Sequence, residues 1–598
     1  MNGVAQVRAV TPNGGSVSAR TPHGMRGRTA ALETALDQAR AASSQVLLTG
    51  PGVHDLLIDA QGRALWLVDA IRSHCARRGL GLVFYRLGVG AQSLPTLRDG
   101  GSVALRPGPA EELPDETITR VIQDLRSAAV PSVLLLDYLD SVLPAEGLAA
   151  ADHGRASLLE NLRCLTADAK GWQRHGLQAV LVDRSDSLPA QLRNQPGYRT
   201  ITVDPPDQTE RVLFVRRRTE SRRVHALRLD GDVTVERAAR VTGGLLLRDL
   251  HELAVSSNAN PVTVHTLAAL KASRIQERSG GALELLNCAG VMDDIAGLPG
   301  LRLYLSDLRL AGRGSVRICL AGPPGTGKTY AAQRIAGFLG VPLVRFGQVH
   351  GSLLGESESN MRRALSLLCS MAPVTVLIDE ADQGPLGARD GSGRTGNEAH
   401  LALRAMLFEF LSDPNADDGI SVVATTNVPQ RLDPAARSRF SAFLPVLFGS
   451  GPELAKIMAM HARRQPEAIP IDGDHVGVLT RFVAAGGVLS GRSAQSVLES
   501  AWRNALRAGE RVVRPEDIET ALALRANQDW NAATEYSTLS ALSMAPDASV
   551  LPWIAAQLLG ESYDPPARLQ AYLTPSGAVD IGAVQTRIHE LETAGVYR

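Results

Sequence analysis

One glycine-rich stretch constrains the fold of this chain more than any other. The apolar run 316–321 leads into Gly-Pro-Pro-Gly-Thr-Gly-Lys-Thr at 322–329, and an alanine-rich run typical of a helix follows. A buried strand, a phosphate-binding loop and a helix have this order. Lys328 is expected to reach the β- and γ-phosphates of a nucleotide, and the Thr329 hydroxyl to ligate Mg²⁺. The predicted nucleotide-binding residues are Gly322, Pro323, Pro324, Gly325, Thr326, Gly327, Lys328, Thr329 and Tyr330.

A chance match to this motif is improbable because lysine is rare here. The whole chain contains four lysines, at positions 170, 271, 328 and 456. One of them stands where the motif requires it, after a predicted strand and before a predicted helix.

The overall composition indicates several globular domains. The chain has 598 residues, 44% hydrophobic and 21% charged, and no apolar run approaches the length of a membrane span, so we expect no membrane insertion. Residues 1–27, rich in Gly, Ser, Thr and Pro, are predicted to be a disordered leader. Five cysteines without Cys-x-x-Cys spacing indicate a reducing compartment, hence the cytoplasm. Lys plus Arg equals Asp plus Glu at 62 each, so nucleic acid is not expected as the main partner.

Residues 28–283 are predicted to form a first α/β domain. Short apolar strands are expected at 45–50, 81–87, 132–137 and 177–182, separated by helical stretches, which favours a parallel sheet. The first strand runs into Thr49-Gly-Pro-Gly, which has the glycines of a phosphate loop without its lysine. Asp137 ends its strand as a metal-holding carboxylate would, but Tyr138 stands where a catalytic Glu belongs. The domain is interpreted as a degenerate internal copy of the second half, with an unrelated α/β domain as the alternative.

Carboxylates end a second apolar run in the other half of the chain. Residues 374–378 lead into Asp379 and Glu380, a pattern that would deliver Asp379 to Mg²⁺ through water and Glu380 to an attacking water. The next run, 420–426, ends at Asn427, which could orient that water or sense the γ-phosphate; a turn-forming Asn is the alternative.

Together, residues 322–329, 376–382, 425–427 and 431–440 resemble, in order and spacing, the AAA+ ATPases, specifically the AAA family proper. The resemblance runs from residues 293–297 to about 525. It implies that Ile295 lies on the adenine side and that Arg437 and Arg439 are arginine fingers reaching a neighbouring subunit's phosphate. It also implies that Arg492 is a second sensor at the start of a lid helix. The implied assembly is a homo-oligomeric ring, a hexamer.

Two loops of the resemblance bear on substrate handling. The position that is usually aromatic in the first pore loop is Leu353, which offers less contact area for gripping polypeptide and puts vigorous threading in doubt. Residues 384–396, with five glycines, correspond to the second pore-facing loop, or to a plain surface linker.

The predicted fold class is α/β: an AAA+ P-loop parallel sheet at 284–448 with a helical lid at 449–526, preceded by the degenerate α/β domain. Residues 527–598 form a helical tail, with a winged-helix-like module as the alternative. The predicted function is ATP hydrolysis in a ring that remodels a protein substrate or works through an adaptor. A nucleotide-gated scaffold with little turnover, or a nucleic-acid motor, stays open as an alternative.

Overall fold

A computed structural model describes most of the chain. It covers residues 8–10, 16–18, 27–96, 101–109, 112–143, 153–167, 176–183, 188–221, 226–231, 233–257, 260–286, 298–310, 315–347, 356–384, 386–387, 398–412, 419–465, 467–524 and 529–596. The chain divides into two compact units, Met1–Thr263 and Val264–Arg598. None of the helices in the covered ranges has the length and apolar character needed to cross a bilayer.

The second unit is built on a six-stranded sheet in the order β11-β13-β14-β15-β12-β16. Its strands are β11 (Leu283–Leu286), β12 (Arg317–Ala321), β13 (Leu343–Phe346), β14 (Val374–Ile378), β15 (Ile420–Thr426) and β16 (Ala442–Pro445). All neighbours pair in parallel except β11, which lies antiparallel to β13 at the edge. Strand β12 therefore ends between β15 and β16, and β15 ends beside β14. This sheet confirms the predicted α/β fold class.

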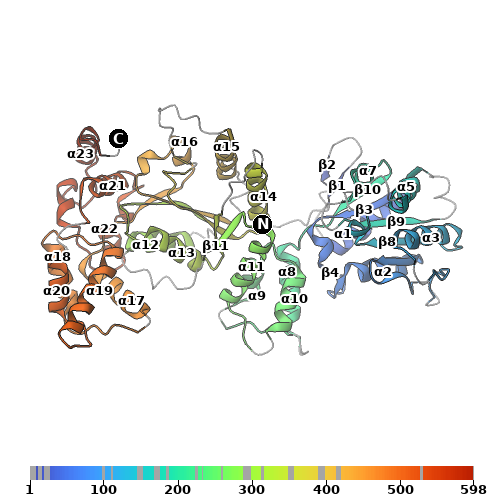
Figure 1. The fold of residues 1–598 in the computed structure, drawn as a ribbon, viewed down its shortest axis with the longest axis horizontal. Coiled ribbons are helices and arrows are strands. Elements are labelled where there is room, and N and C mark those ends of the chain that lie inside the picture. The colour runs from blue at the N-terminus through green and yellow to red at the C-terminus, as the bar shows by residue number, and fades with distance from the viewer. Residues whose placement is uncertain are drawn as a thin grey trace. The chain divides into compact units, whose positions relative to one another are not determined.

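Helices pack on this sheet because its strands are apolar on both faces. Every residue of β14 and β15 is buried, as expected of strands covered on both sides. One hydrophobic cluster joins Leu301 and Leu305 of α12 and Ile335 of α13 to the strands, and Figure 1 shows both helices beside the sheet. The helices of this part are α11 (Val264–Ser279), α12 (Pro299–Leu310), α13 (Lys328–Leu339), α14 (Glu356–Ser370), α15 (Glu398–Ser412), η4 (Pro429–Arg431) and α16 (Pro434–Arg437).

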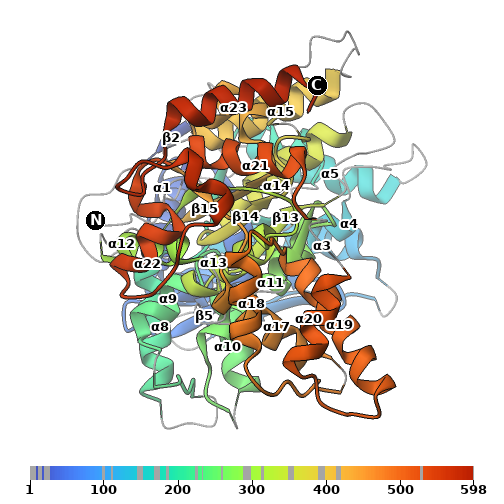
Figure 2. The same ribbon diagram turned by 90° about the vertical axis from the view of Figure 1, so that its left-hand side faces the viewer.

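A four-helix lid and a helical tail complete the second unit. The lid consists of α17 (Gly451–Arg464), α18 (His475–Ala484), α19 (Gly491–Arg507) and α20 (Pro515–Ala523). The tail consists of α21 (Ala532–Ser543), η5 (Ala548–Val550), α22 (Pro552–Leu558), η6 (Ala567–Tyr572) and α23 (Ile581–Thr593). Figures 1 and 2 show the lid helices as one group and α21 with α23 as another. The tail shares a hydrophobic cluster with Ala321, Val428 and Leu447 of the core.

The first unit contains an eight-stranded sheet in the order β2-β1-β10-β3-β9-β8-β6-β7. Its strands are β1 (Arg8–Val10), β2 (Ser16–Ser18), β3 (Gln45–Thr49), β6 (Gly81–Arg86), β7 (Gly90–Leu94), β8 (Ser132–Asp137), β9 (Gln178–Val182) and β10 (Tyr198–Thr202), with a separate hairpin of β4 (Leu56–Ile58) and β5 (Ala64–Trp66). Its helices are α1 (Arg28–Ala41), η1 (Pro51–His54), α2 (Leu67–Arg78), α3 (Pro114–Ser127), α4 (Leu139–Val142), α5 (His153–Ala167), α7 (Ala190–Arg193), α8 (Gln208–Thr219), α9 (Val235–Val241) and α10 (Leu247–Ser256). The four strands predicted for this part are present.

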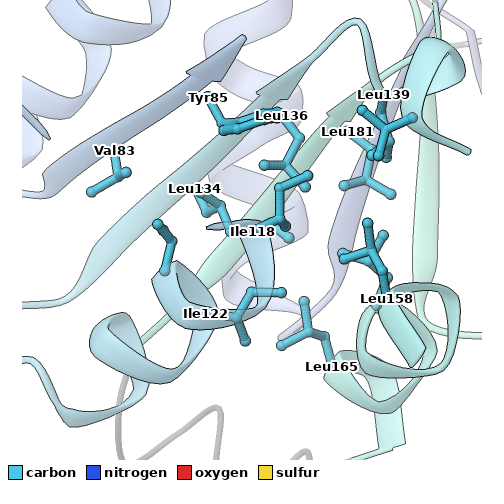
Figure 3. Packing of buried hydrophobic residues seen from close by; sticks show 14 of the residues in the cluster. Val83, Tyr85, Ile118, Ile122, Leu134, Leu136, Leu139, Leu158, Leu165 and Leu181 are labelled. Carbon is cyan, nitrogen blue, oxygen red and sulfur yellow. The ribbon is translucent and has the colours of Figure 1, made fainter. Parts of the chain in front are cut away.

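Six strands of the first sheet repeat the order and directions of the second. The run β7-β6-β8-β9-β3-β10 is parallel apart from its antiparallel edge strand β7, as β11-β13-β14-β15-β12-β16 is apart from β11. Strand β3, before the Gly50 loop, takes the place of β12. One face of this sheet buries Leu134 and Leu136 of β8 against Ile118 and Ile122 of α3, with Leu158 of α5 beside them (Figure 3).

Two features differ from the expected domain limits. Strands β1 and β2 fall inside the segment expected to be a disordered leader. They pair with each other, and β1 pairs with β10, which would otherwise be an edge strand with unpaired backbone groups. Helix α11, expected in the first domain, belongs to the second unit. Its buried Lys271 donates from Nζ to the carbonyl oxygen of Pro373 at 2.7 Å.

Candidate active site

The loop between β12 and α13 depends on glycine for its shape. A Cβ on Gly322 would lie 2.0 Å from the carbonyl oxygen of Val446, so no side chain fits there. Gly325 and Gly327 have φ angles of 80° and 93°, in the left-handed region that favours glycine. Gly327 precedes the first residue of α13. Free N–H groups at that helix end favour an anion, which is the arrangement of phosphate loops.

Lys328 is the buried cation of this loop. Its Nζ donates to the carbonyl oxygens of Gly322 and Pro323 and to Oδ1 of Asn427, each at 2.8 Å. All three ammonium protons therefore have partners. Burial lowers the pKa of Lys328 to about 8, against the opposing influence of nearby carboxylates, chiefly Asp382. A phosphate at this loop would compete for an ammonium that the protein already holds in place.

Hydroxyl groups fix the carboxylate that ends β14. Thr329 donates from Oγ1 to Oδ1 of Asp379 at 3.1 Å, and the Thr425 hydroxyl donates to the same carboxylate. Thr425 Oγ1 also accepts the backbone N–H of Glu380 at 3.0 Å. Glu380 has a φ of 48°, uncommon for a residue with a side chain and typical of strained functional positions. The turn after β14 is thus held with Asp379 against the loop and Glu380 exposed beside it.

The oxygen atoms of Thr329 and Asp379 suit a divalent cation. Mg²⁺ takes oxygen ligands and is usually held by one or two protein groups together with phosphates. These two residues would hold it, and the ion when bound would neutralise charge on phosphate oxygens. Within the ranges that the structure covers, no group of three or more His, Cys, Asp or Glu side chains has the arrangement of a metal site.

The two predicted arginine fingers differ in their surroundings. Arg439 donates from Nε to Oγ of Ser412 at 2.7 Å and lies over the ring of Phe408, 5.0 Å from its centroid. Its guanidinium also bonds the Ala435 carbonyl. Arg437, at the end of α16, is half-buried, and its guanidinium has no hydrogen bond or ion pair to any residue of the described part. Of the two, Arg437 is available to a group outside this chain.

The lid meets the glycine-rich loop at the start of α19. The backbone N–H of Gly491 donates to the carbonyl oxygen of Gly325 at 3.1 Å. A Cβ on Gly325 would lie 3.9 Å from Cβ of Arg492, so the predicted second sensor lies next to the loop, with an exposed side chain. Tyr330 contacts the lid as well, since its hydroxyl accepts from Arg464 of α17 at 3.3 Å.

Some predicted site residues lie outside the described residues, and others were not predicted. Ile295, Leu353 and most of the loop 384–396 belong to the undescribed ranges. Thr425 was part of the motif 425–427 but was given no role of its own, although hydroxyl residues at a strand end beside a carboxylate are a readable signal. Asp529, which accepts hydrogen bonds from the lid, has no local motif that would have identified it.

The corresponding strand ends of the first unit hold different groups. After β3 the chain forms the short η1 instead of a helix, and Asp55 pairs with Arg28 at 2.9 Å with both side chains buried. Arg28 also pairs with Glu210 of α8, and burial raises the pKa of both carboxyl groups. Asp137 is held by Arg86 at 2.8 Å. Tyr138, at the position of Glu380, shares its left-handed backbone with a φ of 58°.

Comparison with known proteins gives a family for the part of the chain that carries this site. Residues 318–446 match the family described as "ATPase family associated with various cellular activities (AAA)". An ATP-dependent zinc metalloprotease FtsH of Caldicellulosiruptor bescii is 32% identical over 34% of this chain and 33% of its own length. A protein of Methanocaldococcus jannaschii named as a homolog of a 26S proteasome regulatory subunit is 30% identical over 37% of this chain and 58% of its own.

A second FtsH relative matches a similar share of the chain. The FtsH 3 of Sphaerobacter thermophilus is 30% identical over 38% of this chain and 48% of its own length. The chain thus covers less than two thirds of each of these relatives. The family match spans β12 to β16, which supply the loop, the carboxylates and Asn427. Residues 318–446 therefore form a domain of the AAA family of ATPases.

Proposed function

We propose that the protein binds and hydrolyses ATP with Mg²⁺ and uses the turnover, in a ring of copies of itself, to remodel a protein partner. One observation carries the proposal: Lys328, Thr329 with Asp379, and the Glu380 turn converge at neighbouring strand ends beside a glycine-rich loop. Each group has a distinct role in phosphoryl transfer: Lys328 binds phosphate, Thr329 and Asp379 hold the metal ion, and Glu380 activates water.

The roles of these groups follow from their chemistry. Lys328 presents a point charge to the β- and γ-phosphates once a nucleotide displaces the loop carbonyls. Glu380 lies at an exposed turn with its backbone fixed by Thr425, so its carboxylate can accept the proton of an attacking water. Asn427, now bonded to Lys328, would be released toward the γ-phosphate or the water when the ammonium changes partners.

Different observations support the proposed ring and the proposed class of substrate. Arg437, half-buried and without a partner in the described part of its own chain, is suited to a phosphate held by a neighbouring copy. Two relatives are named as ATP-dependent proteases and one as a proteasome regulatory subunit homolog, which favours proteins as the class of substrate. The proposed assembly is a hexamer, and the proposed compartment is the cytoplasm.

Zinc protease activity is not part of the proposal. The sequence contains no His-Glu-x-x-His, the helical zinc motif of many metalloproteases. The alternative of a nucleotide-gated scaffold predicts binding without turnover, and a nucleic-acid motor predicts binding whose affinity falls steeply with salt.

The first unit is proposed to be a degenerate copy that does not bind ATP. The repeated strand order supports a common origin of the two sheets. The Gly50 loop has no lysine, and Tyr138 cannot act as a general base in place of Glu380. Arg28 with its two buried carboxylates already joins the end of this loop to α8.

Replacement of Glu380 tests the proposal. Glu380→Gln keeps the shape and loses the charge, so turnover should fall by about 10²–10⁴ in a phosphate-release assay. Calorimetric titration of the same variant should still show binding, saturating at one ATP per chain. Wild-type protein that binds ATP without releasing phosphate would favour the scaffold, and two ATP per chain would contradict the degenerate copy.

A further inference from the structure

The tail bonds the lid through Asp529, at the start of α19, and through Arg568, which donates from Nε to the carbonyl oxygen of Gly486 at 2.7 Å. Asp529 accepts the backbone N–H of Ser490 with Oδ2 and the hydroxyl of Ser493 with Oδ1, both at 2.8 Å. Both donors lie at the start of α19, next to the predicted second sensor Arg492. Ser490 already caps this helix, because its hydroxyl accepts the N–H of Ser493 at 3.1 Å. The start of α19 is therefore capped without Asp529. The two hydrogen bonds of Asp529 instead fix the position of this turn of the lid.

The same turn of the lid lies on the phosphate loop. Gly491 donates to the Gly325 carbonyl at 3.1 Å, and a Cβ on Gly325 would lie 3.1 Å from Ser490. Asp529 is thus one residue removed from a direct contact with the loop. A shift of the Ser490 turn by an ångström would move the lid relative to the site that the phosphates occupy.

The tail is fixed to the core independently of the lid. Gln430, which follows the Asn427 strand end, donates from Nε2 to Oγ of Ser543 at 3.0 Å. Tyr563 donates its hydroxyl to the Phe448 carbonyl at 2.9 Å, and its burial raises its pKa. Next to Asp529, Trp530 packs on Phe448 with ring centroids 6.3 Å apart. The residue that holds the lid turn is therefore itself positioned by the core.

We propose that Asp529 is a positioning residue for nucleotide binding, through which the tail fixes the lid turn at 490–492 over the phosphate loop. The inference rests on the proposed function, because it needs ATP at this loop. It extends that function, because it makes the tail part of the nucleotide site. By linkage, a nucleotide that orders the turn stabilises the docked tail to the same degree.

Substitution of Asp529 tests this against a matched tail carboxylate. Asp580 caps α23 by accepting the N–H of Ala583 at 3.1 Å, and its carboxylate makes no bond to the described residues of the lid. Asp529→Ala removes two hydrogen bonds to a charged group and should raise the KM for ATP about tenfold while kcat changes less than about threefold. Asp529→Asn keeps one acceptor and should fall between wild type and Asp529→Ala. Asp580→Ala should leave KM unchanged.

Hydrogen exchange gives a second measurement that needs no variant. In the wild-type protein, ADP should slow amide exchange in the tail segment 529–543 as well as in the lid turn. Unchanged exchange in that segment, or a KM for Asp529→Ala equal to that of Asp580→Ala, would overturn the inference and leave the proposed function standing. A wild-type protein that binds no ATP would overturn both.

Discussion

At the scale of single residues, the buried ammonium of Lys328 is expected to make nucleotide affinity depend on pH. Its pKa of about 8 lies below the usual 10.5 because burial disfavours the charge. Phosphate prefers the charged form, so binding above pH 8 takes up a proton. We expect the affinity for ADP to fall about fivefold from pH 8 to pH 9. Calorimetry in two buffers of different ionisation enthalpy measures both the affinity and the proton uptake.

Lys328→Arg provides the control for this pH dependence. A guanidinium keeps its charge throughout this range, so the variant should show a flat affinity, even if a weaker one. The effect of Lys328 on folding stability has the opposite direction. Between pH 8 and 10.5 the unfolded chain binds more protons than the folded one, so this residue makes the free energy of unfolding rise with pH. A wild-type affinity that is constant from pH 7 to 9 would contradict a pKa of about 8 for Lys328 in the nucleotide-free protein.

At the scale of elements, the Arg28 network should hold the first unit together. Arg28 begins α1, pairs with Asp55 after η1, and pairs with Glu210 on α8, with the three side chains 6% exposed or less. Arg28→Met leaves two buried carboxylates without their cation, which destabilises a protein by about 3–5 kcal/mol. Denaturant unfolding measures the loss of unfolding free energy, and hydrogen exchange in residues 27–58 shows whether the loss lies in this part of the unit.

An exposed arginine of the same unit is the matched control for Arg28. Arg63 pairs with Asp59 and is 66% exposed, so Arg63→Met should change stability by less than about 1 kcal/mol. Equal effects of the two substitutions would show that the buried network does not determine the stability of the unit.

The sequence predicted these elements well where local patterns carry the information. Apolar runs bounded by glycine or carboxylates identified the strands, because a strand buried on both faces needs such a run. The phosphate loop was readable because its residues are adjacent in sequence. Asp529 was not predictable, since its partners Ser490 and Ser493 belong to another element and nothing in their spacing encodes the pairing. That Arg439 reaches a neighbouring subunit stays a prediction; its contacts with Ser412 and Phe408 of α15 could not be predicted, because no local pattern encodes them.

At the scale of the whole molecule, the active site is predicted to be shared between copies of the chain. Arg437 should contact the phosphate of a neighbour and stabilise the charge that develops in the transition state, an effect of about 10³–10⁵ in rate for arginine fingers. Arg437→Ala should therefore bind ATP normally and hydrolyse it poorly. Because Arg439 is engaged within its own chain, Arg439→Ala should have the smaller effect on turnover. Phosphate release and ATP titration of both variants measure the difference.

Mixing two inactive variants tests sharing directly. Arg437→Ala combined with Glu380→Gln creates some interfaces with an intact Glu380 on one side and an intact Arg437 on the other. Partial recovery of hydrolysis supports a shared site, once light scattering has shown that the two variants co-assemble. Co-assembly without recovery at any ratio would count against it.

The cluster that joins the tail to Ala321, Val428 and Leu447 also has a consequence for the order of folding. Ala321 ends the strand before the phosphate loop, and most of the other buried residues of its cluster lie more than two hundred positions later, among them Tyr536 and Trp553. During synthesis the N-terminal parts of a chain emerge and fold first. The strand that carries the ATP site therefore stays partly uncovered until the tail has left the ribosome. A nascent chain would complete its nucleotide site late, and in the proposed ring this delay would exclude unfinished copies from assembly.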